Sequence, residues 1–78
     1  MIQDKIKKGD LIKANRSMWG NFFNPNYGSI NIEIKENTLF VAVSDEIIVA
    51  GRSEIFGLID NRIVSIGIRD ENQLQVVR

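Results

Sequence analysis

Residues 53–68 contain two runs of apolar, mostly β-branched residues on either side of the dipeptide Asp60-Asn61. Asp and Asn tolerate positive φ better than most residues, and a type I′ turn needs positive φ at both central positions. The stretch therefore predicts a two-residue β-hairpin. Pairing outward from the turn sets Ile59 opposite Arg62, Leu58 opposite Ile63, Gly57 opposite Val64 and Phe56 opposite Ser65. Large apolar side chains on both faces of both strands are typical of a hairpin in the centre of a small barrel.

Shorter segments on either side of this hairpin also have the pattern of β-strands. The clearest is 28–35, where Ile30, Ile32 and Ile34 alternate with polar residues, as in a strand with one solvent-exposed face. Glu36-Asn37 predicts a second two-residue turn, after which the chain returns as a strand that is apolar on both faces. That returning strand is 38–43. The remaining predicted strands are 11–14, 47–50 (a short strand or a continuation across a bulge) and the edge strand 74–77.

Strands this few and this short cannot form two well-packed layers unless the sheet curls and closes, which also hides its edges. We therefore expect an all-β fold, a single small barrel of five to six short antiparallel strands. The domain spans residues 1–78, with 1–8 as a charged lead-in and 15–27 as a long first loop. Gly57 and Gly67 are expected to mark bulges or tight bends that allow closure.

The order of these signals resembles that of SH3-like barrels, particularly the branch of KOW modules and translation proteins. The resemblance covers most of the chain and implies an SH3-like fold, without implying particular binding residues. KOW modules usually have a short first loop, whereas 15–27 is long and aromatic, which is more similar to peptide-binding SH3 domains. The resemblance rests on Gly9-Asp10-Leu11-Ile12, Gly28-Ser29-Ile30, Phe40-Val41-Ala42-Val43 and Leu74-Gln75-Val76.

Histidine and cysteine are both missing from the chain, which removes the commonest catalytic base, the commonest transition-metal ligand and any disulfide. The adjacent carboxylates at 45–46 and 70–71 lie where turns are expected, and no serine lies in a nucleophile elbow. We therefore expect a non-catalytic protein with no metal and no other cofactor. The first residues lack the apolar core of a signal peptide, and no apolar run is long enough to span a membrane, so we expect a cytoplasmic protein.

Four of the six aromatic residues lie within 15–27. Trp and Tyr offer large contact areas at small entropic cost and are enriched at binding hot spots. A binding module that uses these aromatic side chains would suit a small viral or bacterial accessory protein that modifies a larger assembly. The alternative is that the same aromatic side chains fold back and cap an open end of the barrel. We predict that this loop binds a protein partner through Arg16, Trp19, Phe22, Phe23 and Tyr27.

Two further functions stay open. Residues 1–20 carry five basic and two acidic side chains, a balance of +3, although the whole chain has ten of each. A basic surface with stacking rings is what RNA or single-stranded DNA prefers. The other possibility is a structural subunit that self-associates through the edge at 74–77. The nucleic-acid surface would combine Trp19 and Tyr27 with Lys7, Lys8, Lys13 and Arg16.

Overall fold

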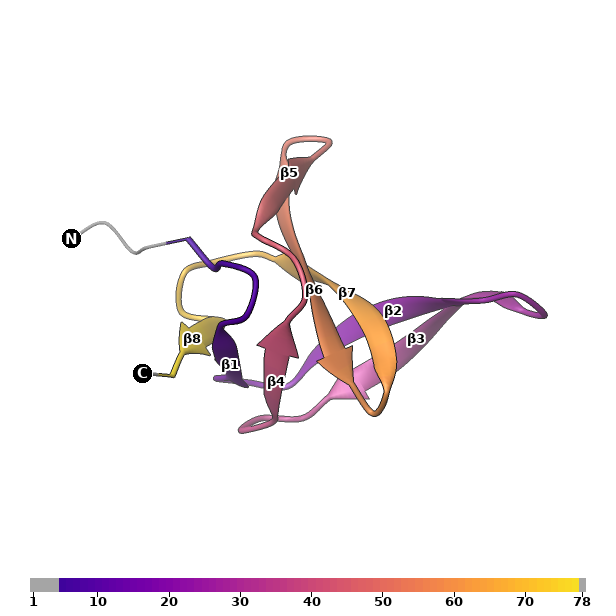
Figure 1. The fold of residues 1–78 in the computed structure, drawn as a ribbon, viewed down its shortest axis with the longest axis horizontal. Coiled ribbons are helices and arrows are strands. Elements are labelled where there is room, and N and C mark those ends of the chain that lie inside the picture. The colour runs from indigo at the N-terminus through magenta and orange to yellow at the C-terminus, as the bar shows by residue number, and fades with distance from the viewer. Residues whose placement is uncertain (1–4, 78) are drawn as a thin grey trace.

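A computed structural model describes residues 5–77, and within them the chain is all-β, as expected. The described strands pair antiparallel in one sheet, with the order β3-β2-β7-β6-β4-β1-β8, and β5 pairs with β6 off this path (Figure 1). The strands are β1 (Leu11–Ala14), β2 (Met18–Asn24), β3 (Gly28–Ile34), β4 (Leu39–Ala42), β5 (Ile47–Val49), β6 (Arg52–Ile59), β7 (Arg62–Ile68) and β8 (Leu74–Val76).

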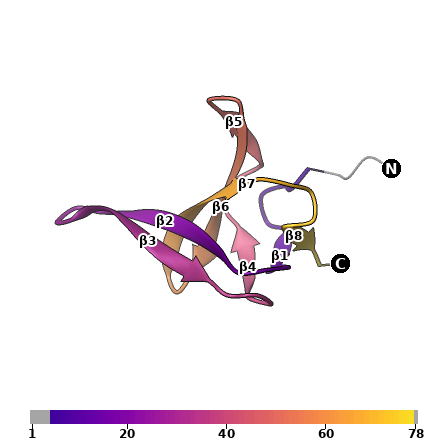
Figure 2. The same cartoon turned by 180° about the vertical axis from the view of Figure 1, so that it is seen from behind.

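The sheet is open, so the expectation of a closed barrel of five to six strands is wrong. β3 lies at one end of the strand order and β8 at the other, and the described part of the chain forms eight strands. The reason is that β2 and β3 form a long hairpin that joins the rest of the sheet through the single pair Asn21–Ser65. This hairpin extends away from the other strands instead of returning to close the sheet (Figure 2).

The predicted central hairpin is confirmed. All four predicted residue pairs of β6 and β7 are present, beginning with Ile59 opposite Arg62 next to the turn. Asp60 and Asn61 have φ values of 52° and 63°, as the type I′ turn requires. Pairing continues without interruption from the turn to Ser53 opposite Ile68, and β2, β4 and β5 all pair with this hairpin.

Gly57 and Gly67 do not form the expected bulges, because the register of β6 and β7 stays regular through both positions. Gly57 instead allows a close approach. A Cβ at this position would stand 2.5 Å from Cδ2 of Phe40, which means that the Phe40 ring packs directly on the backbone of β6. No atom lies within 4 Å of the corresponding position at Gly67.

The turn at Glu36-Asn37 is present, but it joins strands that do not pair with each other. Asn37 has a φ of 72°, and the N–H of Thr38 donates to the C=O of Lys35. β3 pairs with β2, whereas β4 pairs with β1 and β6. β5 follows β4 along the same edge of β6 after an interruption at 43–46, as expected of a strand that continues across a bulge.

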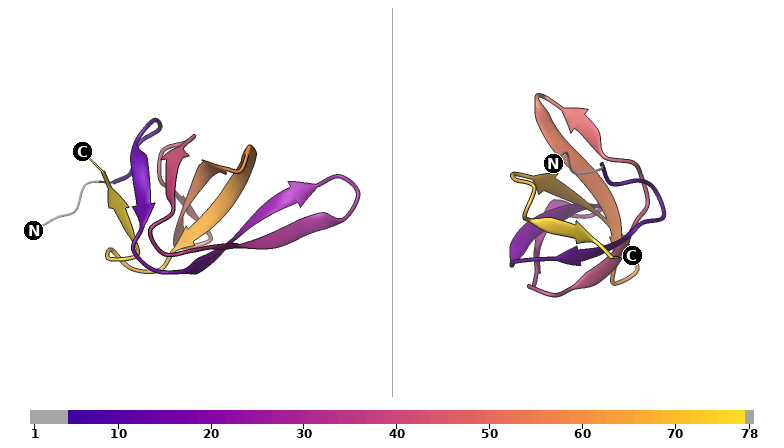
Figure 3. Two further views of the ribbon diagram at one scale, coloured as in Figure 1. Left: turned by 90° about the horizontal axis from the view of Figure 1, so that it is seen from below. Right: turned by 90° about the vertical axis from the view of Figure 1, so that its left-hand side faces the viewer.

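The sheet curls (Figure 3). The core lies on one of its faces, which we call the inner face. Ile6 of the charged lead-in is buried here too, and its C=O accepts the N–H of Glu46 at 2.9 Å. The first four residues of the predicted lead-in lie outside the described part of the chain. The buried core consists of Ile6, Ile12, Ala14, Ile34, Phe40, Ala42, Ile55, Ile59, Val64, Ile66 and Leu74.

Candidate functional site: the outer apolar face

The aromatic segment 15–27 is mostly a strand, so its prediction as a loop is wrong. Residues 18–24 form β2, which pairs with β3 over seven residue pairs. At the tip, Oδ1 of Asn24 accepts the backbone N–H groups of Asn26 and Tyr27. The abundance of Asn and Gly obscured the strand pattern in the sequence. We call the hairpin of residues 18–34 the arm.

Alternation along β2 places the predicted aromatic side chains on two faces of the arm. Phe22 faces inward and is half-buried, with the guanidinium carbon of Arg62 at 4.7 Å from its ring centroid. Trp19 and Phe23 face outward, and Tyr27 lies at the tip. These three side chains are 68%, 76% and 80% exposed, so they do not cap an end of the sheet.

Arg16 is engaged with a carboxylate on the segment before β8. Its Nη2 donates to Oδ2 of Asp70 at 2.6 Å, and both side chains are partly exposed. This hydrogen bond from Arg16, with smaller contributions from the backbone N–H of Asn72, holds the pKa of Asp70 below its ordinary value. The Arg16 side chain therefore points towards the 69–73 segment and not along the arm.

The cations of the nucleic-acid alternative are distributed along β1 and its flanks. Figure 1 shows the segment before β1 and the tip of the arm at opposite ends of the molecule. Acidic side chains accompany this segment, because the backbone N–H of Lys7 donates to Asp10 and that of Lys8 donates to Asp45. The structure does not bring Lys7 and Lys8 to the ring of Tyr27, and Lys13 is half-buried within β1.

The face opposite the core carries a row of exposed apolar side chains that the sequence reasoning missed. Leu11, Val41, Leu58 and Ile63 are successive partners across β1, β4, β6 and β7. Directly opposed residues of an antiparallel sheet point to the same face. Their exposed fractions rise from 38% at Leu11 to 60% at Ile63. The N–H of Val77 donates to the C=O of Leu11, so the exposed Val77 continues the row.

A signal for this row was present in the sequence. The segments 38–43 and 53–59 are apolar on both faces, a pattern that predicted strands covered on both sides within a barrel. Because the sheet is open, residues 5–77 cover only the inner side of these strands. The second apolar side is therefore left exposed.

The row and the arm share one face of the sheet. Asn21 lies opposite Ser65, and Ser65 lies opposite Phe56. Trp19 and Phe23 are two residues on either side of Asn21, so they point to the same face as these partners. We call this surface the outer apolar face; it comprises Leu11, Trp19, Phe23, Leu39, Val41, Phe56, Leu58, Ile63 and Val77.

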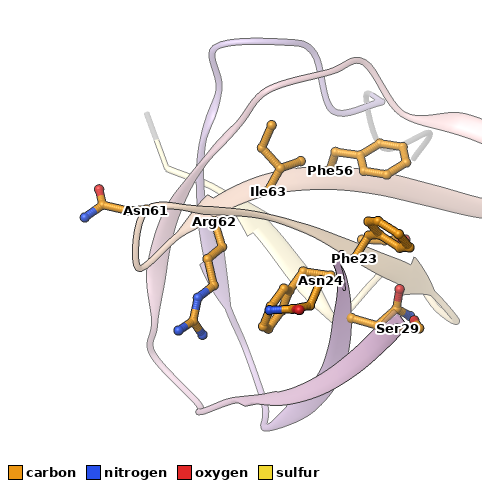
Figure 4. Close-up of a pocket in the computed structure, with 10 residues that line it drawn as sticks. Phe23, Asn24, Ser29, Phe56, Asn61, Arg62 and Ile63 are labelled. Carbon is orange, nitrogen blue, oxygen red and sulfur yellow. The ribbon is translucent and has the colours of Figure 1, made fainter. Parts of the chain in front are cut away.

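A cleft opens where the arm leaves the rest of the sheet (Figure 4). Its volume is about 730 Å³, within the usual range for binding sites. Phe23, Phe56 and Ile63 supply apolar surface, and Asn24 and Asn61 supply amide groups. A cleft with both apolar and hydrogen-bonding walls is suited to holding a side chain or an extended segment of another molecule. The remaining lining residues are Asn21, Phe22, Ser29, Arg62 and Ser65.

Several polar side chains of the described residues take part in local hydrogen bonds. On the outer face, the hydroxyl of Ser65 donates to Oε1 of Glu54. Within residues 5–77, no three carboxylates gather in a way that could hold a metal ion. In the same residues, no helix has the length and apolar character needed to cross a membrane. No family model matches this chain, and neither the curated proteins nor the solved structures gave a match.

Proposed function

We propose that this protein is a non-catalytic binding module whose outer apolar face docks on a larger protein. The proposal is carried by the cross-strand row from Leu11 to Ile63, which stays exposed opposite the core. A sheet that is apolar on both faces needs a covering layer on each, and large exposed apolar patches mark interaction sites. In this proposal the partner protein supplies the second layer.

The composition of the arm supports the same proposal. Residues 18–34 contain a single charged side chain, Glu33, although about a quarter of the whole chain is charged. Interface cores are depleted in charged residues and enriched in aromatic ones. Trp19 and Phe23 are therefore the anchors that we expect to contribute most of the binding free energy. The cleft beside Phe23 would receive a side chain or an extended segment of the partner.

Photo-crosslinking in the cells from which the protein comes tests this proposal. A photoreactive benzoylphenylalanine would replace Trp19 or Ile63 on the outer apolar face, or Ile48 in β5 as the control. Ile48 is also exposed, but β5 lies outside the row. We expect both outer-face positions to crosslink to the same protein, identified by mass spectrometry, and the control position not to crosslink to it.

Two results would contradict protein docking on this face. One is equal crosslinking of the same protein from Ile48, because the contact would then not depend on the outer apolar face. The other is crosslinking to RNA or DNA alone, combined with retention on heparin that falls steeply as salt is raised. That second result would favour the nucleic-acid alternative and its lysines.

A further inference from the structure

β3 has an unpaired edge along its whole length. Its seven residues pair with β2 on one side, and among the described residues nothing pairs with its other side. Such an edge presents a row of free backbone N–H and C=O groups to any suitable strand. The opposite end of the sheet is different, because β8 has only three residues.

The usual protections of an edge strand are missing from β3. Native proteins guard such edges with proline, lysine, a bulge or a covering segment. Gly28–Ile34 contains neither proline nor lysine, and its register with β2 is regular from end to end. Its single charge, Glu33, is one residue from the end of the strand. The edge is therefore open to strand addition.

The inner face of the arm is only partly covered by the other strands. A two-stranded hairpin standing alone is at best marginally stable in water. Asn21–Ser65 is the single residue pair that joins the arm to the other described strands. The base of the arm packs on the core through Ile34, but its tip extends beyond the other strands (Figure 3, left). Ile30 and Ile32 on its inner face are only half-buried. A further strand beside β3 would add both backbone hydrogen bonds and apolar cover.

We propose that two copies of this chain pair antiparallel through β3, with Asn31 on the two-fold axis between them. When two identical strands pair antiparallel about a two-fold axis, one residue must lie opposite the same residue of the other copy. For a seven-residue strand, only the central residue does so while pairing all seven positions. The resulting pairs are Asn31 with Asn31, Ile30 with Ile32, Ser29 with Glu33 and Gly28 with Ile34.

The strand is complementary to itself in this register. Ile30 would meet Ile32 of the partner copy on the inner face, where both are half-buried in the single chain. Glu33 would face a serine and not another carboxylate, so no like charges are opposed. The chain as a whole has no net charge, so the two copies would not repel each other at a distance.

The assembly would end at the dimer. A two-fold pairing uses the same edge in both copies and leaves β8 at the outer ends of the joined sheet, with the equally short β5 as a further edge beside β6. Three residues form too short an edge to template further growth. This dimer uses the edge of the arm and not its outer face, so it goes beyond the docking function and both contacts could form at once.

Charge substitutions at Asn31 test the dimer and its register. Asn31 is exposed, so neither Asn31→Lys nor Asn31→Glu should disturb the folded single chain. In each variant two like charges would meet at the axis, and we expect the dimer to weaken by about tenfold or more. An equimolar mixture of the two variants should restore the dimer, because opposite charges then meet. Sedimentation equilibrium measures all three samples.

Asn21→Lys is the matched control, because Asn21 lies opposite Asn31 on the same face but one strand away from the edge. This variant should dimerise as the unmodified protein does. The proposal is overturned if the unmodified protein stays monomeric at all concentrations, if both single variants at Asn31 still dimerise, or if Asn21→Lys is the only variant that loses the dimer. A mixture that fails to restore the dimer overturns the proposed register.

Discussion

The ring of Phe40 lies directly on the backbone of Gly57, so closely that a Cβ on Gly57 would stand 2.5 Å from Cδ2 of Phe40. Gly57→Ala should therefore displace a core ring and lower the free energy of unfolding by about 1–3 kcal/mol, measured by urea denaturation. Gly67→Ala in the paired strand is the control, because open space surrounds that position. It should change the free energy by less than about 0.5 kcal/mol. Equal losses in the two variants would contradict the close packing on Gly57.

The hairpin turn offers a stabilising substitution. Asn61 adopts a φ of 63°, which a residue with a Cβ reaches at some cost. Asn61→Gly creates Asp-Gly, one of the dipeptides favoured in type I′ turns, and should raise the free energy of unfolding by about 0.5 kcal/mol. Asn61→Val should lower it by about 1–2 kcal/mol, because β-branched residues strongly resist positive φ. A higher free energy of unfolding for Asn61→Val would show that the positive φ at this position does not affect the stability of the hairpin.

The pair Arg16–Asp70 predicts a dependence of stability on pH. The hydrogen bond from Arg16 lowers the pKa of Asp70 in the folded state, so the pair stabilises the fold at pH values above the ordinary pKa of about 3.9. That contribution is lost as the pH falls through the lowered pKa. Denaturation curves between pH 2 and 6 should show Arg16→Gln less stable than the unmodified protein above about pH 4, with the two converging in acid.

Because both side chains of this pair are partly exposed, the difference should be small and should shrink as salt is added. A difference between the two proteins that stays constant over this pH range would mean that Arg16 acts through something other than Asp70.

Phe22 and Phe23 are neighbours in sequence with opposite surroundings. Phe22 faces inward under the guanidinium of Arg62, whereas Phe23 points to solvent. Replacement by threonine keeps a residue of high strand propensity at each position. We expect Phe22→Thr to cost about 2 kcal/mol through lost packing and lost cation–π contact, and Phe23→Thr to cost less than about 0.5 kcal/mol. The reverse order, measured by urea denaturation, would contradict the assignment of faces along β2.

Local chemistry made the central hairpin predictable from the sequence. Asp60-Asn61 fixes the turn type, and the turn type fixes every pair from Ile59 outward. The alternation of Ile30, Ile32 and Ile34 likewise identified β3 and its inner face. The SH3-like resemblance stays a prediction, because the all-β antiparallel sheet is compatible with many small β folds.

The openness of the sheet could not be predicted, because it depends on pairings between distant segments. Nothing local in β2 shows that its backbone pairs with β7 only at Asn21, and nothing in Val41 shows that it lies between Leu11 and Leu58. The aromatic side chains at Trp19, Phe23 and Tyr27 were identified by residue type alone. Their grouping with the cross-strand row required the register of the whole sheet.

Two isoleucines of β7 test the open outer face most directly. Ile63 belongs to the exposed row, and Ile66 on the same strand is fully buried in the core. Urea denaturation should show that Ile63→Thr changes the free energy of unfolding by less than about 0.5 kcal/mol, whereas Ile66→Thr lowers it by about 3 kcal/mol. A loss at Ile63 as large as that at Ile66 would mean that the chain itself covers this face, and it would contradict an outer surface left open for a partner.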